Sequence, residues 1–222
     1  RLVVFTQGCP MRCAYCHNPD TWQFGIGTEK SVKEILATFN RNRAFYRNGG
    51  ITATGGEPLA QPEFIAALFE AAHNDPQGRI HTCLDSSGVA YNPETPEKFE
   101  RVLDNTDLVL LDIKHSDPKS HISLCEVGSE RPLAFGDELN RRGIKVLIRH
   151  VVVPGITDSP EELAGVGRII AHWDNVIGLD LLPYHMMGVK KYEELGIPYK
   201  LTGTPAMDGK KIPELRKQVL IA

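Results

Sequence analysis

The sequence predicts an α/β fold: a partial (β/α)6 barrel, that is, an open parallel sheet with helices on its outside. Strand-like and helix-like segments alternate along the 222 residues, and such alternation is typical of parallel sheets. Residues 108–113 form a strand that is apolar except for Asp112, as expected where helices cover a parallel sheet. Six strand–helix units are too few for a closed eight-stranded barrel and are compatible with an open one.

The first half of the chain contains three expected strands, at residues 2–6, 51–54 and 79–84. Between the first two, residues 31–46 predict a helix, because apolar side chains recur there at helical spacing and Ser31 with Glu34 forms a capping box. A second helix is expected to begin near Pro62, with its apolar residues on one face, and a third covers residues 97–103.

The second half repeats this pattern with strands at residues 108–113, 145–153 and 177–182. Helices are expected at residues 130–142, after the Ser159-Pro160 cap, and at residues 213–220. Residues 186–208 are rich in Gly, Lys and Pro and predict a long, mobile loop. Without a long linker or repeat, we expect residues 1–222 to form one domain, trimmed at both ends.

The composition excludes several classes of protein. The net charge of −3 gives no sign of a nucleic-acid binder, and no apolar run approaches the ~20 residues that a membrane span needs. Three of the five cysteines are clustered, which does not resemble a disulfide framework. We therefore expect a cytoplasmic protein in a reducing setting, and a monomer.

The most informative motif is Cys9-Pro-Met-Arg-Cys13-Ala-Tyr-Cys16. Three thiolates spaced this closely can hold three irons of one 4Fe–4S cluster and leave the fourth iron open for chemistry. Zinc is the alternative metal. It would need a fourth ligand, and His17 is badly placed because it is adjacent to Cys16. Three small buried hydrophobic residues are a further alternative, but the polar residues between them do not resemble a core strand.

The string FTQGCPMRCAYCHNPDTW, with CxxxCxxC at its centre, resembles the radical S-adenosylmethionine (radical SAM) enzymes, and within them the pyruvate formate-lyase activating enzymes. The resemblance continues in order through TGGEP, HTCLDSSG, LLDIK, IRHVVVPG and LLPYH, and so covers nearly the whole chain. It implies the partial barrel of the radical SAM fold, a 4Fe–4S cluster on Cys9, Cys13 and Cys16, and S-adenosyl-L-methionine bound at its open iron.

Each of these motifs lies at the C-terminal end of a predicted strand, at the face where barrel enzymes place their active sites. The resemblance assigns cofactor contacts to residues at these ends: Gly56, Asp112, Ile113, Lys114, Arg149 and His185. The residues alone leave other roles open. The Gly55-Gly56 pair also suits an ordinary turn, Asp112 and Lys114 also suit a mutual ion pair, and Arg149 also suits a structural pair.

The resemblance implies further contacts around the cofactor. Tyr15 and His17 flank the third cysteine and would shield the cluster and line the adenine pocket. Asp85 would help to bind a monovalent cation, and Ser86 stands where the family usually has threonine. We predict that Cys83 lies in the core, and the sequence assigns no role to Cys125.

The expected activity is glycyl-radical activation of pyruvate formate-lyase, with a flavodoxin-like electron donor. The interval from Cys16 to Gly55 contains no further cysteine, whereas many activases of other glycyl radical enzymes carry a ferredoxin-like insert there. The alternatives are a radical SAM enzyme that acts on another glycyl radical enzyme or on a small molecule, and a non-catalytic iron–sulfur or zinc protein that binds a partner.

Overall fold

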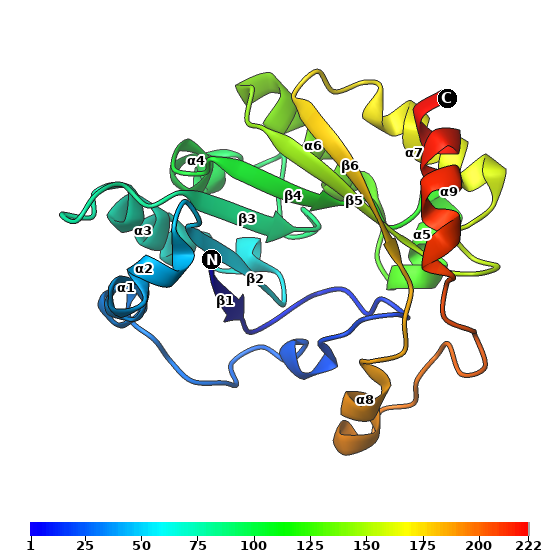
Figure 1. Cartoon of the computed structure of the whole chain (residues 1–222), viewed down its shortest axis with the longest axis horizontal. Helices are drawn as coiled ribbons and strands as arrows, with labels where there is room; N and C mark the ends of the chain where they lie inside the picture. Colours follow the sequence, from blue (N-terminus) through cyan, green and yellow to red (C-terminus); the bar gives the residue numbers. More distant parts are fainter. Residues whose placement is uncertain (222) are drawn as a thin grey trace.

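A single sheet of six parallel strands organises the protein, as the computed structural model shows for residues 1–221 (Figure 1). The strands are β1 (Leu2–Thr6), β2 (Ile51–Gly55), β3 (Thr82–Ser86), β4 (Leu108–Asp112), β5 (Val146–Val152) and β6 (Val176–Pro183). Each strand pairs with the next one in sequence. Within residues 1–221, β1 and β6 do not pair with each other, so the sheet stays open as predicted.

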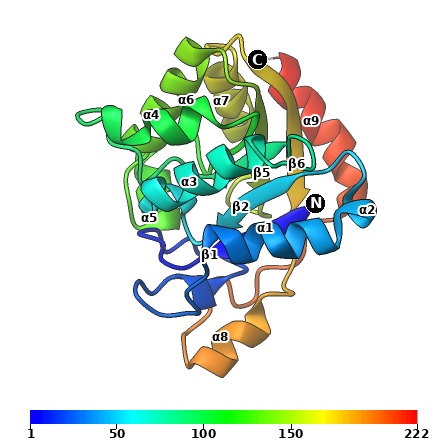
Figure 2. The same ribbon diagram turned by 90° about the vertical axis from the view of Figure 1, so that its left-hand side faces the viewer.

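Helices connect the strands and cover the outer face of the sheet (Figures 1 and 2). They are α1 (Val32–Arg41), α2 (Arg43–Tyr46), α3 (Pro62–His73), α4 (Glu97–Asp104), α5 (Pro118–Cys125), α6 (Glu130–Arg142), α7 (Pro160–Ile170), α8 (Val189–Leu195) and α9 (Ile212–Ile221). The exception is α8, which projects from the lower end of the molecule in both views. None of the helices in this described range combines the length and the apolar character needed to cross a lipid bilayer.

The two faces of the sheet differ in burial. On the outer face, alternate residues such as Ile51, Val109 and Ile148 are at most 1% exposed, because helices pack on them. On the inner face, Val3 and Phe5 of β1 are 46% and 58% exposed. The inner face therefore lines an open hollow, and its strand ends carry the polar residues described below.

Three sequence-based expectations need correction, and one helix was not predicted at all. The helix predicted over residues 31–46 is interrupted at Asn42, so α1 and α2 are separate, although the Ser31–Glu34 capping box is confirmed. The strand predicted over residues 79–84 begins at Thr82 and extends to Ser86.

The unpredicted helix is α5, and the third correction concerns α8, which the sequence pattern did not indicate. Asp117 caps α5 by accepting a hydrogen bond from the Ser120 backbone N–H, but the mixed composition of α5 gives it no clear apolar stripe. The segment 186–208, expected to be a loop, contains α8, which ends at Gly196 in a left-handed conformation.

Candidate functional site

The cysteine loop follows β1 and is held by backbone hydrogen bonds to the end of α5. Arg12 N–H donates to the carbonyl of Cys125 at 2.9 Å, and Ala14 N–H donates to that of Leu124 at 2.9 Å. All five cysteines are free thiols. Cys13 is buried and Cys9 and Cys16 are partly buried, so the loop presents thiols in a sheltered place without disulfides.

Burial changes the acidity of these thiols. It raises the pKa of Cys9 to about 12 and that of Cys16 above its usual value, while the hydrogen bond to Cys125 and burial raise the pKa of Cys13. Such thiols stay protonated until a metal replaces the proton. Within residues 1–221, no three His, Cys, Asp or Glu side chains are arranged so that they could hold one metal ion. The choice between a 4Fe–4S cluster and a zinc ion therefore rests on the cysteine motif.

Four charged side chains meet on the inner face of the sheet, towards the C-terminal ends of β3, β4 and β5. Arg149 donates from Nε to Asp112 Oδ1 at 2.8 Å and from its two terminal nitrogens to Asp85. Lys114 Nζ donates to Asp112 Oδ2 at 2.7 Å. Strand register places Arg149 opposite Asp112, so these four residues, which we call the strand-end charge cluster, are brought together by the sheet as predicted. The ion pairs weighed as alternatives for Asp112, Lys114 and Arg149 are present.

Burial and mutual attraction shift the pKa values of the cluster. Burial alone would raise the pKa of Asp112, but the cations of Lys114 and Arg149 hold it below its usual value. Burial and the nearby Asp112 raise the pKa of Asp85. The pKa values of Lys114 and Arg149 rise because their carboxylate partners outweigh burial. Two cations and two carboxylates thus form a compensated set beneath the mouth of the barrel.

The Gly55-Gly56-Glu57 turn links β2 to the cysteine loop. Gly56 N–H donates to Thr6 O at 2.9 Å, and a Cβ at Gly56 would lie 2.3 Å from the carbonyl oxygen of Gly8. Gly55 has φ +108°, which only glycine adopts without strain. Glycine is therefore required for the close approach of the two loops, whatever else Gly56 contacts.

Glu57 is a site residue that the sequence analysis did not single out. It is only 1% exposed, and its carboxylate accepts hydrogen bonds from the hydroxyls of Ser86 and Ser87 at 2.6 and 2.7 Å. It also accepts from the backbone N–H groups of Ser87 and Leu59. Glu57 therefore fixes the β2 and β3 loops to each other. Its place in the TGGEP string is the sequence signal by which Glu57 could have been identified as a site residue.

His17 and His185 lie together although 168 residues separate them in the sequence. Their rings stack with centroids 4.1 Å apart, and His17 Nε2 is 3.1 Å from the carbonyl oxygen of His185. Among the residues that the structure describes, the buried Nδ1 of His185 and the buried hydroxyl of Tyr15 have no hydrogen-bond partner. Lys114 Nζ lies 5.7 Å from the centre of the Tyr15 ring. Two unpartnered polar atoms beside the cysteine loop suit a polar ligand there.

Helix α8 contacts the cysteine loop, which no sequence pattern indicated. Lys191 Nζ donates to Asn18 Oδ1 and Asp20 Oδ1, both at 2.9 Å. The Tyr192 hydroxyl donates to the carbonyl of Cys16 at 3.0 Å, and its ring meets Trp22 edge to face. We refer to the Lys191 and Tyr192 contacts as the α8 clasp.

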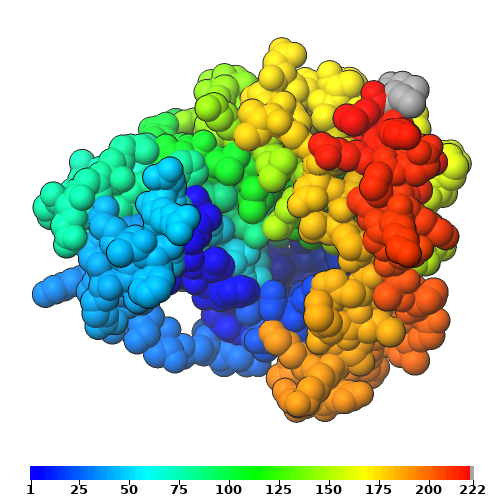
Figure 3. Space-filling model, viewed as in Figure 1, coloured from blue at the N-terminus to red at the C-terminus, as the bar shows by residue number. Residues whose placement is uncertain are grey.

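Two cavities lie away from the strand-end charge cluster. A groove of about 860 Å³ runs along the free edge of β1, lined by Val3, Phe5 and residues 24–30. On the side drawn in Figure 3, the molecule is hollowed between the blue N-terminal segment and the orange segment around α8.

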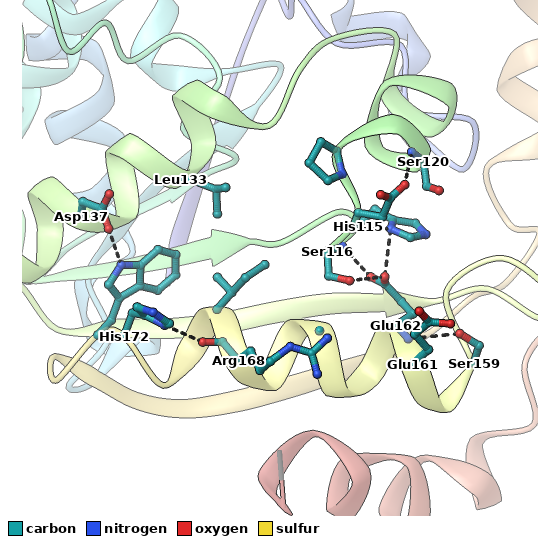
Figure 4. Close-up of a pocket in the computed structure, with 15 residues that line it drawn as sticks. His115, Ser116, Ser120, Leu133, Asp137, Ser159, Glu161, Glu162, Arg168 and His172 are labelled. Atoms are coloured by element: carbon teal, nitrogen blue, oxygen red, sulfur yellow. Dashed lines mark hydrogen bonds and ion pairs between the residues drawn. The ribbon is translucent and has the colours of Figure 1, made fainter.

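The second cavity, of about 810 Å³, lies among the β4–α5 turn, α6 and α7 (Figure 4). Glu162 is at one end, where it binds His115 and Ser116, and the Trp173–Asp137 hydrogen bond is at the other. Because these polar groups satisfy one another, the cavity carries no feature of the predicted chemistry.

The predicted site residues thus meet at one end of the barrel. Ile113 is buried and donates its N–H to Arg149 O at 3.0 Å. Cys83 is buried, as predicted. The contacts of Asp85 are Arg149 and Thr54. The cofactor roles of these residues, and the cation site at Asp85, remain predictions.

Comparisons with known proteins agree with this geometry. Residues 3–165 match the model of the radical SAM superfamily. The chain is 42% identical to the pyruvate formate-lyase-activating enzyme of Clostridium pasteurianum, over 98% of this chain and 89% of the relative. It is 39% identical to that of Staphylococcus epidermidis, over 99% and 88%.

Solved structures share the fold. The Streptococcus suis protein SuiB bound to S-adenosylmethionine gives a TM-score of 0.69 at 17% identity, over 98% of this chain and 46% of SuiB. A domain of pyruvate-formate lyase-activating enzyme from Bacteroides vulgatus gives 0.59 at 23% identity, over 78% of this chain and 93% of that domain. The cysteine loop, the open barrel and these relatives together show that the chain belongs to the radical SAM superfamily and, within it, to the pyruvate formate-lyase-activating enzymes.

Proposed function

We propose that this enzyme activates pyruvate formate-lyase by generating a radical on one of its backbone glycines. The single observation that carries the proposal is the similarity to enzymes of that name, 42% identity over 98% of the chain. The ordered strand-end motifs support it, because they lie on one mouth with the cysteine loop. When bound, a 4Fe–4S cluster and S-adenosyl-L-methionine would supply the radical chemistry for removing a hydrogen atom from that glycine.

The cysteine loop would hold the cluster through Cys9, Cys13 and Cys16. Its sheltered position supports this assignment, since solvent access controls the redox behaviour of iron–sulfur clusters. The backbone hydrogen bonds to α5 and the α8 clasp fix the loop from two sides. They would therefore set where the open iron faces relative to the strand ends.

The strand-end charge cluster would bind the amino-acid part of S-adenosyl-L-methionine. Arg149 and Lys114 offer cations to its carboxylate, and Asp112 offers an anion to its amino group. Gly56 would present backbone close to that amino group, and His185, with its unpartnered Nδ1, would contact the nucleoside. Ile113, Tyr15 and His17 would complete the walls of this pocket.

A partner protein would approach through the open side of the barrel. The exposed inner face of β1 leaves room for an extended loop, and Met186 and Met187, 51% and 79% exposed, follow His185 at the same mouth. Since a carbon-centred radical is unselective, selectivity must come from placing one C–H bond beside it and excluding other donors. An open groove that closes around a partner loop would serve this purpose.

Three accessory assignments belong to the same proposal. A monovalent cation would bind beside Asp85, where it would compete with Arg149 for the carboxylate. A flavodoxin-like protein would deliver the electron. The enzyme would act as a monomer in the cytoplasm, in keeping with its five free thiols.

The test uses cluster-loaded protein, reductant, S-adenosyl-L-methionine and pyruvate formate-lyase under anaerobic conditions. We expect a doublet radical signal in electron paramagnetic resonance and 5′-deoxyadenosine in comparable amount. Replacing the target glycine of the partner with alanine should abolish the doublet. Cofactor cleavage without any glycyl radical, together with turnover of a small metabolite, would identify the enzyme as a radical SAM enzyme of another kind.

A further inference from the structure

Cys125 lies against the cysteine loop although 112 residues separate it from Cys13. The two sulfur atoms are 3.5 Å apart, and both side chains are buried. Within residues 1–221 this is the only hydrogen bond between two thiols. The proposed function uses Cys13 and leaves Cys125 without a task.

The backbone holds this pair in place. Hydrogen bonds from Arg12 N–H to Cys125 O and from Ala14 N–H to Leu124 O, each 2.9 Å long, lie on either side of Cys13 in the sequence. A disulfide bond is about 2.05 Å long, so closing the 3.5 Å gap requires a movement of roughly 1.5 Å by the sulfur atoms. Such a movement is within reach of small side-chain rotations.

We propose that Cys125 is a resolving thiol, which forms a disulfide with Cys13 after oxidative loss of the metal group and so preserves Cys13 for reloading. The disulfide itself depends only on the two thiols. Its consequence for reloading rests on the proposed function, in which Cys13 is a cluster ligand.

The oxidant is hydrogen peroxide, and the chemistry runs in two steps. A departing metal leaves Cys13 as a thiolate, whose sulfur attacks one peroxide oxygen; the O–O bond breaks, and with one proton from solvent a sulfenic acid and water form. The Cys125 sulfur then attacks the Cys13 sulfur, the S–O bond breaks, and the hydroxyl leaves as a second water. Overall the two thiols lose two hydrogen atoms and one peroxide is reduced to two waters.

Without Cys125 the sulfenic acid at Cys13 has a different fate. Further peroxide oxidises it to a sulfinic acid, which thiol reductants do not reverse. The other cysteines of the loop are the competing partners, but within residues 1–221 no hydrogen bond joins the Cys13 sulfur to that of Cys9 or Cys16. Cys125 therefore determines whether the oxidation of Cys13 stays reversible.

The test begins with the cluster-loaded full chain as wild type, Cys125→Ala and Cys83→Ala. Cys83 is the matched control, since it is also buried and free, and within the described residues no hydrogen bond joins it to another thiol. Each protein is treated with hydrogen peroxide, quenched with catalase, alkylated, digested and mapped by mass spectrometry. We expect a Cys13–Cys125 linked peptide in wild type and in Cys83→Ala. In Cys125→Ala the Cys13 peptide should instead gain about 32 Da, the mass of two oxygens.

Reloading supplies the second readout. After dithiothreitol, iron and sulfide, wild type and Cys83→Ala should regain their cluster, and Cys125→Ala should regain at least about five-fold less, because sulfinic acid resists thiols. A second variant, Cys125→Ser, should behave like Cys125→Ala. Linkage of Cys13 to Cys9 or Cys16 in wild type, or equal sulfinic acid in wild type and Cys125→Ala, would overturn the proposal. The linked peptide is read by mass, so this outcome is separate from any failure of cluster loading.

Discussion

The cysteine loop and the strand-end charge cluster lie at the same mouth but are held in place differently. The charge cluster depends on sheet register, which sets Asp112 beside Arg149. The cysteine loop is irregular, and it depends on contacts from α5 and α8. Its partners there, Cys125 and Tyr192, lie 112 and 176 positions after Cys13 and Cys16 in the sequence. Damage to one region should therefore leave the other folded, and the predictions below test that separation.

The largest expected effect is loss of the cluster in Cys13→Ala, Cys9→Ala or Cys16→Ala. With one thiolate missing, the loop cannot hold three irons. Iron and sulfide content after anaerobic reconstitution measures this. Cys83→Ala and, before oxidation, Cys125→Ala should retain full cluster content. A normal cluster in Cys13→Ala would contradict the ligand assignment.

In the charge cluster, Arg149→Met should lower the free energy of unfolding by about 3–5 kcal/mol, because it leaves Asp85 and Asp112 as buried carboxylates that have lost their shared guanidinium partner. Denaturant titration measures this loss. The matched control is Arg101→Met, which removes an exposed ion pair with Glu70 and should cost less than about 1 kcal/mol. Equal losses in the two variants would show that the cluster contributes no more than a surface pair.

Glu57 joins the β2 and β3 loops, and its ionisation gives a prediction on pH. Burial raises the pKa of Glu57 in the folded state, so the folded protein binds its proton more tightly than the unfolded chain does. As pH rises from about 4.3, the ordinary glutamate value, through the raised value, wild type should lose stability relative to Glu57→Gln.

Denaturant titrations of both proteins across this pH range test the sign. The difference between them removes the contributions of all other titrating groups. A wild type that gains stability relative to Glu57→Gln with rising pH would show that the four hydrogen bonds to the carboxylate outweigh its burial.

The smallest expected effect concerns the α8 clasp. Lys191→Met removes the bonds to Asn18 and Asp20 and should cost less than about 1 kcal/mol of stability, because the pair is half exposed. We nevertheless expect faster release of iron to a chelator, since the clasp holds the cysteine loop. Lys190→Met is the control, because Lys190 pairs only within α8. Identical release rates would show that the clasp does not secure the loop.

The same contrast explains what the sequence could predict. Alternating and continuous apolar strands identified the six-stranded sheet. The charge cluster followed because Asp85 and Asp112 lie near the ends of β3 and β4 and Arg149 lies opposite Asp112 in β5. The α8 clasp could not be predicted: Lys191 and Tyr192 lie in a segment rich in glycine and lysine, and their partners are more than 170 residues away. The Cys13–Cys125 contact could not be predicted either, because 112 positions separate the two residues and α5 lacks a clear apolar stripe.

The central claim is that the strand-end charge cluster binds S-adenosyl-L-methionine and is more than a set of ion pairs. The most direct measurement is the affinity of cluster-loaded Asp112→Ala and Lys114→Ala for S-adenosyl-L-methionine, with Arg101→Met as control. We predict full iron–sulfur cluster content and at least about ten-fold weaker binding in both variants, equivalent to about 1.4 kcal/mol. Unchanged affinity in both variants would contradict the claim and leave the strand-end charge cluster as a structural ion-pair network.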